Sequence, residues 1–356
     1  MNKVLYAGLL MTVSLIGLTA CEPMMIDGCD STDTIKTYCG FEKPEDLEPL
    51  GNTPWILVSV LGNFQRADTE GGVFAINLES EETFRLIANV SPDPSTEQCG
   101  GAPDRLRPRG FHVSDLADGG YRLLVVNAAG DQRIERYRID FLDNRPSMTW
   151  QGCVRVPDSL LANDVAATVG DGLVVSHMYE PPRTGWMTVK FMLGLHTGYA
   201  VAWDAERGWR IVPGTDASIA NGIEYDPKAG KVFVASTYGE TLSIADLDGK
   251  EAKTIRIPVQ SDNVTWSDDG RLIAVGHTGI PLIGTSACRN APGQTCSFPF
   301  AAVAIDPVTL RQEIIYAHSD GLIPGASVAL VKDGYIYFGT VFGDRVSRVG
   351  MPPVDG

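Results

Sequence analysis

Basic residues are scarce in this sequence relative to acidic ones. The 356-residue chain has 29 Lys and Arg against 44 Asp and Glu, a formal net charge of −15 at pH 7. Proteins that bind nucleic acid neutralise phosphates with clustered positive charge, so this balance excludes nucleic acid as a partner. It also argues against electrostatic attraction to anionic lipid. The excess of carboxylates is suited to a protein that concentrates a divalent cation.

Long apolar runs are absent as well, and the longest one stands at the start of the chain. Residues 4–18 are apolar and follow a short basic start that contains Lys3. The run is too short to span a membrane and ends in small residues, as a signal peptide does. We therefore predict a signal peptide over residues 1–20.

The sequence Leu18-Thr19-Ala20-Cys21 at the end of this run is typical of bacterial lipoproteins, which are diacylated on the cysteine and cleaved before it. It predicts a membrane anchor on Cys21, a tether over residues 21–40 and a place in the bacterial cell envelope. Glu22 favours the outer membrane. The alternative is an ordinary signal peptide with Cys21 there by chance.

No pair of cysteines has the CxxC spacing of a metal site, and no histidines cluster near them. Six cysteines remain after Cys21, and an even number in an oxidising compartment indicates disulfides. Six cysteines allow fifteen pairings, so the sequence alone leaves the connectivity open. Short loops favour one set of pairs: Cys29–Cys39 and Cys288–Cys296, which leaves Cys99–Cys153.

Helical periodicity is absent over any useful length, and one strand pattern recurs instead. A turn with Gly or Asn is followed by an apolar strand that ends in a small or polar residue. The six copies lie at residues 52–59, 119–127, 172–176, 230–236, 270–277 and 334–340. Six such units favour an all-β, six-bladed β-propeller over the alternative of a β-sandwich. No linker divides the chain, so we expect one domain over residues 41–350 and a monomer.

A second short strand precedes each copy and opens with a polar or small pair. The six pairs are Glu45-Asp46, Arg109-Gly110, Asn163-Asp164, Asn221-Gly222, Asp262-Asn263 and Ala326-Ser327. In a propeller these strands line the central channel, so their openings converge at one mouth. The converging side chains offer carboxylate and amide oxygen, without sulfur or imidazole, which predicts calcium in the channel. The alternative is that Asn and Asp open strands because they are good turn residues.

The same residues resemble the paraoxonase/arylesterase family in order and spacing over residues 41–349. The resemblance is carried by Pro44-Glu45-Asp46-Leu47-Glu48, Asn163-Asp164-Val165, Ala220-Asn221-Gly222-Ile223, Asp262-Asn263-Val264 and Gly339-Thr340-Val341-Phe342. Gluconolactonases and strictosidine-synthase-like propellers are more distant relatives in architecture.

The resemblance implies two calcium ions. A catalytic ion would be held by Glu45, Asn163, Asn221, Asp262 and Asn263. A deeper structural ion would be held by Asp46, Asp164 and the backbone carbonyl of Phe111. The resemblance also implies an active-site role for His277, with a structural histidine at the end of a strand as the alternative, and it places His177 near another family histidine.

Two departures from the family matter. The histidine pair that is often assigned as the base corresponds here to Arg109 and Ala128, and His112 is offset by three residues, so that simple alternation turns it to the other face. The C-terminus also has no cysteine with which to close the ring to the N-terminal segment.

The expected chemistry is metal-assisted hydrolysis of a small-molecule ester or lactone. Asp262 is our first choice for the base or nucleophile and Glu45 the second. Arg109 would bind a substrate carboxylate or the developing oxyanion, and His277 would support proton transfer. The alternative is a non-catalytic, calcium-stabilised propeller that acts as a binding module in the envelope.

Overall fold

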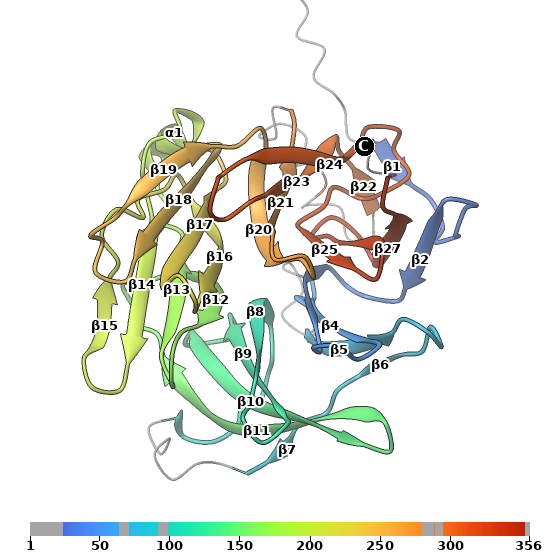
Figure 1. The fold of residues 1–356 in the computed structure, drawn as a ribbon, viewed down its shortest axis with the longest axis horizontal. Helices are drawn as coiled ribbons and strands as arrows, with labels where there is room; N and C mark the ends of the chain where they lie inside the picture. The colour runs from blue at the N-terminus through green and yellow to red at the C-terminus, as the bar shows by residue number, and fades with distance from the viewer. Residues whose placement is uncertain (1–23, 64–70, 92–98, 280–287, 289–294, 353–356) are drawn as a thin grey trace, which may run out of the picture.

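The computed structural model describes residues 24–63, 71–91, 99–279, 288 and 295–352. In this part of the chain, six sheets of four or five strands follow one another around a ring, and a seventh sheet has only two strands (Figure 1). The prediction of a six-bladed β-propeller is therefore confirmed. The predicted signal peptide over residues 1–20 and Cys21 lie outside the described residues.

The first three blades follow the order of the chain, and each runs from the channel outward. Blade 1 consists of β3 (Pro44–Pro49), β4 (Trp55–Val60), β5 (Gly72–Asn77) and β6 (Thr83–Arg85). Blade 2 consists of β8 (Pro108–Asp115), β9 (Tyr121–Asn127), β10 (Arg133–Leu142) and β11 (Arg145–Arg155), with β7 (Asn89–Val90) at its outer edge. Blade 3 consists of β12 (Ala162–Ala167), β13 (Leu173–His177), β14 (Tyr199–Asp204) and β15 (Gly208–Ile211).

The other three blades continue the ring in the same sense. Blade 4 consists of β16 (Ala220–Asp226), β17 (Lys231–Ser236), β18 (Thr241–Asp246) and β19 (Lys253–Arg256). Blade 5 consists of β20 (Gln260–Trp266), β21 (Leu272–His277), β23 (Phe300–Ile305) and β24 (Gln312–His318). Blade 6 consists of β25 (Val328–Lys332), β26 (Tyr335–Gly339), β27 (Arg345–Gly350) and β2 (Ile35–Cys39).

The six apolar repeats of the sequence are the second strands of the blades. They correspond to β4, β9, β13, β17, β21 and β26. The strands that precede them in the chain are the innermost ones, and each packs against the innermost strand of the next blade around the ring. The polar openings therefore lie at the channel, as predicted.

The ring is closed by hydrogen bonds rather than by a disulfide between its ends. The N-terminal strand β2 pairs antiparallel with the C-terminal strand β27, from Ile35 opposite Val349 to Cys39 opposite Arg345. Because residues 35–39 complete the last blade, the propeller begins before residue 41, inside the range that the sequence assigned to the tether. The strand pairing provides the closure for which the C-terminus has no cysteine.

A separate apolar core fills each gap between neighbouring blades. Between blades 1 and 2, for example, Trp55 and Leu57 pack with Tyr137 and Trp150. Corresponding cores lie between each of the other five pairs of neighbouring blades. The burial of these apolar faces is the main favourable term that holds the blades in place.

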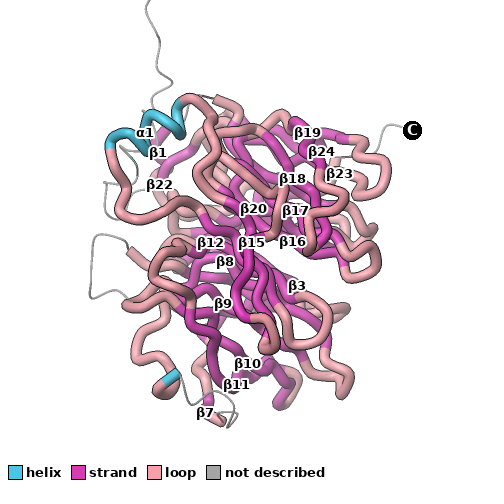
Figure 2. The backbone as a smooth tube through the Cα atoms, turned by 90° about the vertical axis from the view of Figure 1, so that its left-hand side faces the viewer, coloured by secondary structure: helices cyan, strands magenta, loops and turns pink. Residues whose placement is uncertain are grey.

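Two connections lie over the mouth of the channel where the inner strands begin. His177 at the end of β13 pairs with Ala162 at the start of β12, and His277 at the end of β21 pairs with Gln260 at the start of β20. The segments that follow contain α1 (Gly185–Met192) and β22 (Thr295–Ser297), and β22 pairs with β1 (Met24–Ile26). Figure 2 shows α1, β1 and β22 on the same side of the ring.

The helix α1 is a local feature that the sequence periodicity did not predict. It has eight residues, and the side chain of Thr184 caps it by accepting a hydrogen bond from the backbone N–H of Met187. Among the described residues, no helix combines the length and apolarity needed to cross a membrane.

All three predicted disulfides are confirmed: Cys29–Cys39, Cys99–Cys153 and Cys288–Cys296.

Candidate functional site

Five of the six inner strands share a β-bulge at their polar opening. The register shifts between Pro44 and Asp46 in β3, and the same irregularity recurs at the matched position of β8, β12, β16 and β20. A bulge inserts one extra residue, which bends the strand and changes the direction of the side chains beside it. Consecutive residues of one opening can therefore both approach the channel.

The glycines in two of the openings allow neighbouring inner strands to approach closely. A Cβ on Gly110 would collide with the carboxylate of Asp164 in the next blade. A Cβ on Gly222 would lie 2.6 Å from the Cα of Asn263, again in the next blade. Glycine is needed at both positions because the adjacent blade occupies the space of a side chain.

The five predicted ligands of the catalytic calcium lie together at the mouth. The Asn221 amide connects two of them, since its oxygen accepts a hydrogen bond from Asn163 and its Nδ2 donates to Oδ1 of Asp262 at 2.6 Å. On the other side, Nδ2 of Asn263 donates to Oε1 of Glu45 at 3.4 Å. These side chains come from blades 1, 3, 4 and 5, so the structure brings the predicted set together.

Two acceptor oxygens in this group are buried without a donor. Oε2 of Glu45 and Oδ1 of Asn263 find no hydrogen-bond partner among the described residues. Burial raises the pKa of Glu45 well above its ordinary value, and the carboxylates of Asp46 and Asp262 raise it further. Buried polar atoms normally have partners, so orphaned acceptors beside repelling carboxylates indicate a cation site. The donor set is all oxygen, which fits calcium.

Arg109 supplies the nearby positive charge. Its Nη1 donates to the backbone oxygen of Ala162 in the next blade at 2.6 Å, and its guanidinium acts to lower the pKa of Glu45. This effect is weaker than burial and the neighbouring carboxylates, which keep the Glu45 pKa raised. Arg109 therefore lies at the mouth without neutralising the acidic group.

The deeper pair, Asp46 and Asp164, is held by backbone N–H groups. Asp46 accepts from Leu47 and from Phe111 of the next blade, at 2.9 and 3.0 Å. Asp164 accepts in the same way from Val165 at 2.7 Å and from Ile223 of the next blade at 2.8 Å. Burial raises the pKa of Asp46 to about 7 against these hydrogen bonds. Each carboxylate oxygen keeps a further lone pair, so the two side chains could also hold a cation.

The two predicted histidines near the mouth are enclosed by other side chains. His277 is buried, and its ring lies 5.6 Å from those of Phe298 and Phe342. Nδ1 of His177 accepts a hydrogen bond from the backbone N–H of Leu161 at 2.9 Å, and burial lowers the pKa of His177. The geometry of His177 corresponds to a structural role.

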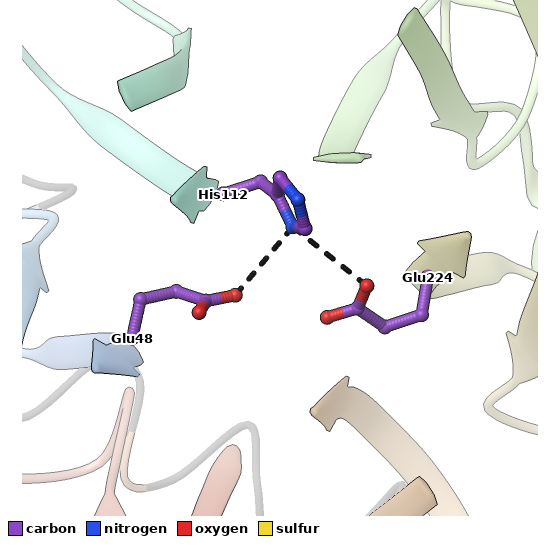
Figure 3. Close-up of side chains that lie close together, drawn as sticks. All are labelled: Glu48, His112 and Glu224. Carbon is purple, nitrogen blue, oxygen red and sulfur yellow. Dashed lines mark ion pairs between the residues drawn. The ribbon is translucent and has the colours of Figure 1, made fainter. Parts of the chain in front are cut away.

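The interpretation of His112 from simple alternation was wrong. The bulge between Pro108 and Phe111 adds a residue to β8, so His112 faces the channel below Arg109 instead of pointing away. There it meets Glu48 of β3 and Glu224 of β16 (Figure 3). Sequence reasoning missed both glutamates. The signal was present, because each lies two residues beyond the second residue of a polar opening.

No family model matches the chain. Serum paraoxonase/arylesterase 2 of chicken (Gallus gallus) is 23% identical to it over 241 residues, which are 66% of this chain and 66% of that protein. The match thus spans about two thirds of the length of that relative.

Solved structures of several propellers share the fold. A luciferin-regenerating enzyme has a TM-score of 0.56 at 11% identity, with 90% of this chain and 96% of that chain covered. A putative gluconolactonase has a TM-score of 0.52 at 14% identity, with 92% and 94% covered. A gluconolactonase from Xanthomonas campestris has a TM-score of 0.51 at 12% identity, with 93% and 95% covered. The chain is a six-bladed β-propeller that resembles the paraoxonase/arylesterase family in sequence.

Proposed function

We propose that this protein is a calcium-dependent hydrolase of esters or lactones. The observation that carries the proposal is the convergence of five oxygen-bearing side chains from four blades at one channel mouth, where two buried acceptors have no donor in the described part of the chain. The name of the curated relative denotes an arylesterase, and two structural neighbours are named as gluconolactonases. These names supply the two substrate classes to test.

In this proposal Glu45, Asn163, Asn221, Asp262 and Asn263 hold the catalytic calcium, and Asp46, Asp164 and the carbonyl of Phe111 hold a structural one. Bound calcium supplies a Lewis acid that polarises the substrate carbonyl and stabilises the oxyanion that develops on attack.

Asp262 is placed best among these residues to act as base or nucleophile. It is the least buried of the five, whereas the other four are more than nine-tenths buried. The hydrogen bond from Nδ2 of Asn221 to its Oδ1 orients the carboxylate at the mouth. Arg109 supplies a positive charge that acts on Glu45, which supports a role in binding a substrate carboxylate or the developing oxyanion. The packing of His277 between two phenylalanine rings leaves it a supporting role.

The proposed place of action is the bacterial cell envelope, with a lipid anchor on Cys21. The proposal rests on the sequence Leu18-Thr19-Ala20-Cys21. The described chain is already attached to the propeller at β1, which pairs with β22 and begins at Met24, three positions after Cys21.

The proposed function is tested by hydrolysis of a chromogenic aryl ester and of a simple lactone, with calcium and with a chelator. The key variant is Asp262→Asn, which keeps an oxygen ligand but removes the basic group. Its turnover should fall by about two to four orders of magnitude, the range for loss of a general base or nucleophile. Calcium affinity should change much less.

Two further variants separate the roles. Glu45→Gln should weaken calcium binding and recover part of its activity in excess calcium. Asp268→Asn makes the same chemical change at an exposed site beyond the far end of β20 and should behave as wild type. Near-normal turnover in Asp262→Asn would reject its assignment as base. Absence of hydrolysis with intact calcium binding would favour the binding-module alternative.

A further inference from the structure

Three ionisable side chains from three different blades meet inside the channel. Glu48 comes from β3, His112 from β8 and Glu224 from β16, and Figure 3 shows them pointing toward one centre. Glu48 lies two residues beyond Asp46 on its strand, and His112 and Glu224 lie two residues beyond Gly110 and Gly222 on theirs. Since side chains two apart on a strand share a face, the three form a second layer about 7 Å further along the channel.

The spacing of the three ligand atoms fits an ion at their centre. Nδ1 of His112 lies 3.7 Å from Oε1 of Glu48 and 3.7 Å from Oε2 of Glu224, and all three atoms are within 4.8 Å of one another. A distance of 3.7 Å is too long for a hydrogen bond. Ligands placed 2.0–2.2 Å from a shared tetrahedral metal ion are about 3.3–3.6 Å apart. A small decrease in the distances between the three atoms would therefore place them around one ion.

The group lacks internal compensation for its charge. Nδ1 of His112 is buried and finds no hydrogen-bond partner among the described residues. The Glu48 and Glu224 carboxylates lie 3.7 Å from this nitrogen, beyond hydrogen-bond distance, so neither is hydrogen-bonded to the imidazole, and the nitrogen can act with both as a ligand of one cation.

The surroundings support the same geometry. Glu224 is held by hydrogen bonds from the backbone N–H of Tyr225 and from the side chain of Trp266, which orient its carboxylate. Outer hydrogen bonds of this kind position metal ligands. The neighbouring inner strand β20 offers Thr265 at this depth, and its hydroxyl donates instead to the backbone oxygen of Ala329 at 2.7 Å. The side chains of Glu48 and His112 keep 12% and 13% exposure, which leaves a route for an ion.

We propose that Glu48, His112 and Glu224 bind a divalent transition-metal ion of the zinc class, separate from the calcium sites, that cross-links blades 1, 2 and 4 inside the channel. Imidazole is the distinguishing ligand. Calcium takes oxygen ligands, whereas one imidazole with two carboxylates suits zinc and its neighbours. The site goes beyond the proposed hydrolase function, because it involves none of the residues assigned to substrate or calcium.

The test uses the whole protein after chelation, with calcium restored to saturation and zinc then titrated. Bound zinc is measured by elemental analysis, and Co²⁺ replaces zinc in a parallel sample so that its visible absorption reports the coordination. The variants are His112→Gln and Glu224→Gln, with His196→Gln as control because His196 is exposed and lies outside the channel. Thermal melting with and without zinc shows whether each variant folds, and Glu48→Gln replaces any that does not.

Wild type and His196→Gln should each bind one zinc per chain and melt at higher temperature with zinc. Loss of one ligand in His112→Gln or Glu224→Gln should weaken zinc binding by about 100-fold or more. Asn221→Ala should keep the zinc site even where calcium binding is weakened, which separates this proposal from the hydrolase proposal. The proposal is overturned if wild type binds no more zinc than His112→Gln, or if millimolar calcium displaces all of the zinc.

Discussion

Ionisation of Asp46 should destabilise the metal-free propeller, and the structure gives the sign and the size of the effect. Burial raises the pKa of this carboxyl from 3.8 to about 7, although Leu47 and Phe111 donate hydrogen bonds to it. A raised pKa means that the folded state binds the proton more tightly than the unfolded state does. The contribution of Asp46 to stability is therefore lost as the pH rises from about 4 to about 7.

The magnitude follows from the shift of about three pKa units, each equivalent to 1.36 kcal/mol. Ionised Asp46 should cost about 4 kcal/mol above pH 7, of which about 2–3 kcal/mol develops between pH 5 and pH 8. Bound calcium should reverse this effect by pairing with the carboxylate, since a ligand that binds only the folded state stabilises it.

The assay is urea unfolding of wild type and Asp46→Asn in chelator, at pH 5 and at pH 8. Buried histidines act in the opposite direction, because the lowered pKa of His112 makes the fold more stable as pH rises. They are common to both proteins, so the difference between the proteins isolates Asp46. The free energy of unfolding of Asp46→Asn, relative to that of wild type, should increase by about 2–3 kcal/mol between pH 5 and pH 8. In saturating calcium at pH 8, wild type should be the more stable protein.

Two results would refute this reasoning. One is a difference between wild type and Asp46→Asn that does not change with pH in chelator. The other is a variant that remains more stable than wild type at pH 8 when calcium is saturating, which would remove Asp46 from the set of calcium ligands.

Three other predictions concern the ions, the anchor and the ring closure. Chelation should lower the melting temperature. Asp164→Ala should lower it more than Asn221→Ala does, because Asp164 is a proposed ligand of the inner ion and also accepts two backbone hydrogen bonds. Equal effects would argue against a separate inner ion. The mature protein should partition into detergent and carry a diacylglyceryl mass on Cys21, whereas Cys21→Ser should be soluble and unmodified; equal partitioning would contradict the anchor. Ile35→Ala in β2 should cost about 2–5 kcal/mol of unfolding free energy, because Ile35 is buried in the closing blade. The control is Lys36→Ala, which should be nearly neutral because an exposed ion pair such as Lys36–Glu81 contributes about 1 kcal/mol or less.

The sequence by itself determined the repeat, the fold and the openings. Six apolar strands with turn residues before them predict six blades, because each strand carries its own pattern of burial. The polar pairs ahead of those strands lie at the channel, and the disulfide pairs favoured by loop length are the ones that form. The calcium ligands and the lipid anchor remain predictions from the sequence.

The tertiary structure decided which side chains meet. His112 faces the channel only because a bulge in β8 interrupts the alternation, and a bulge depends on the pairing of two strands rather than on one pattern. The closing strand β2 belongs to the last blade because its partner β27 comes from the other end of the chain. Glu48 and Glu224 are 176 positions apart in the numbering of the chain, so only the curvature of the ring could bring their carboxylates together around one histidine.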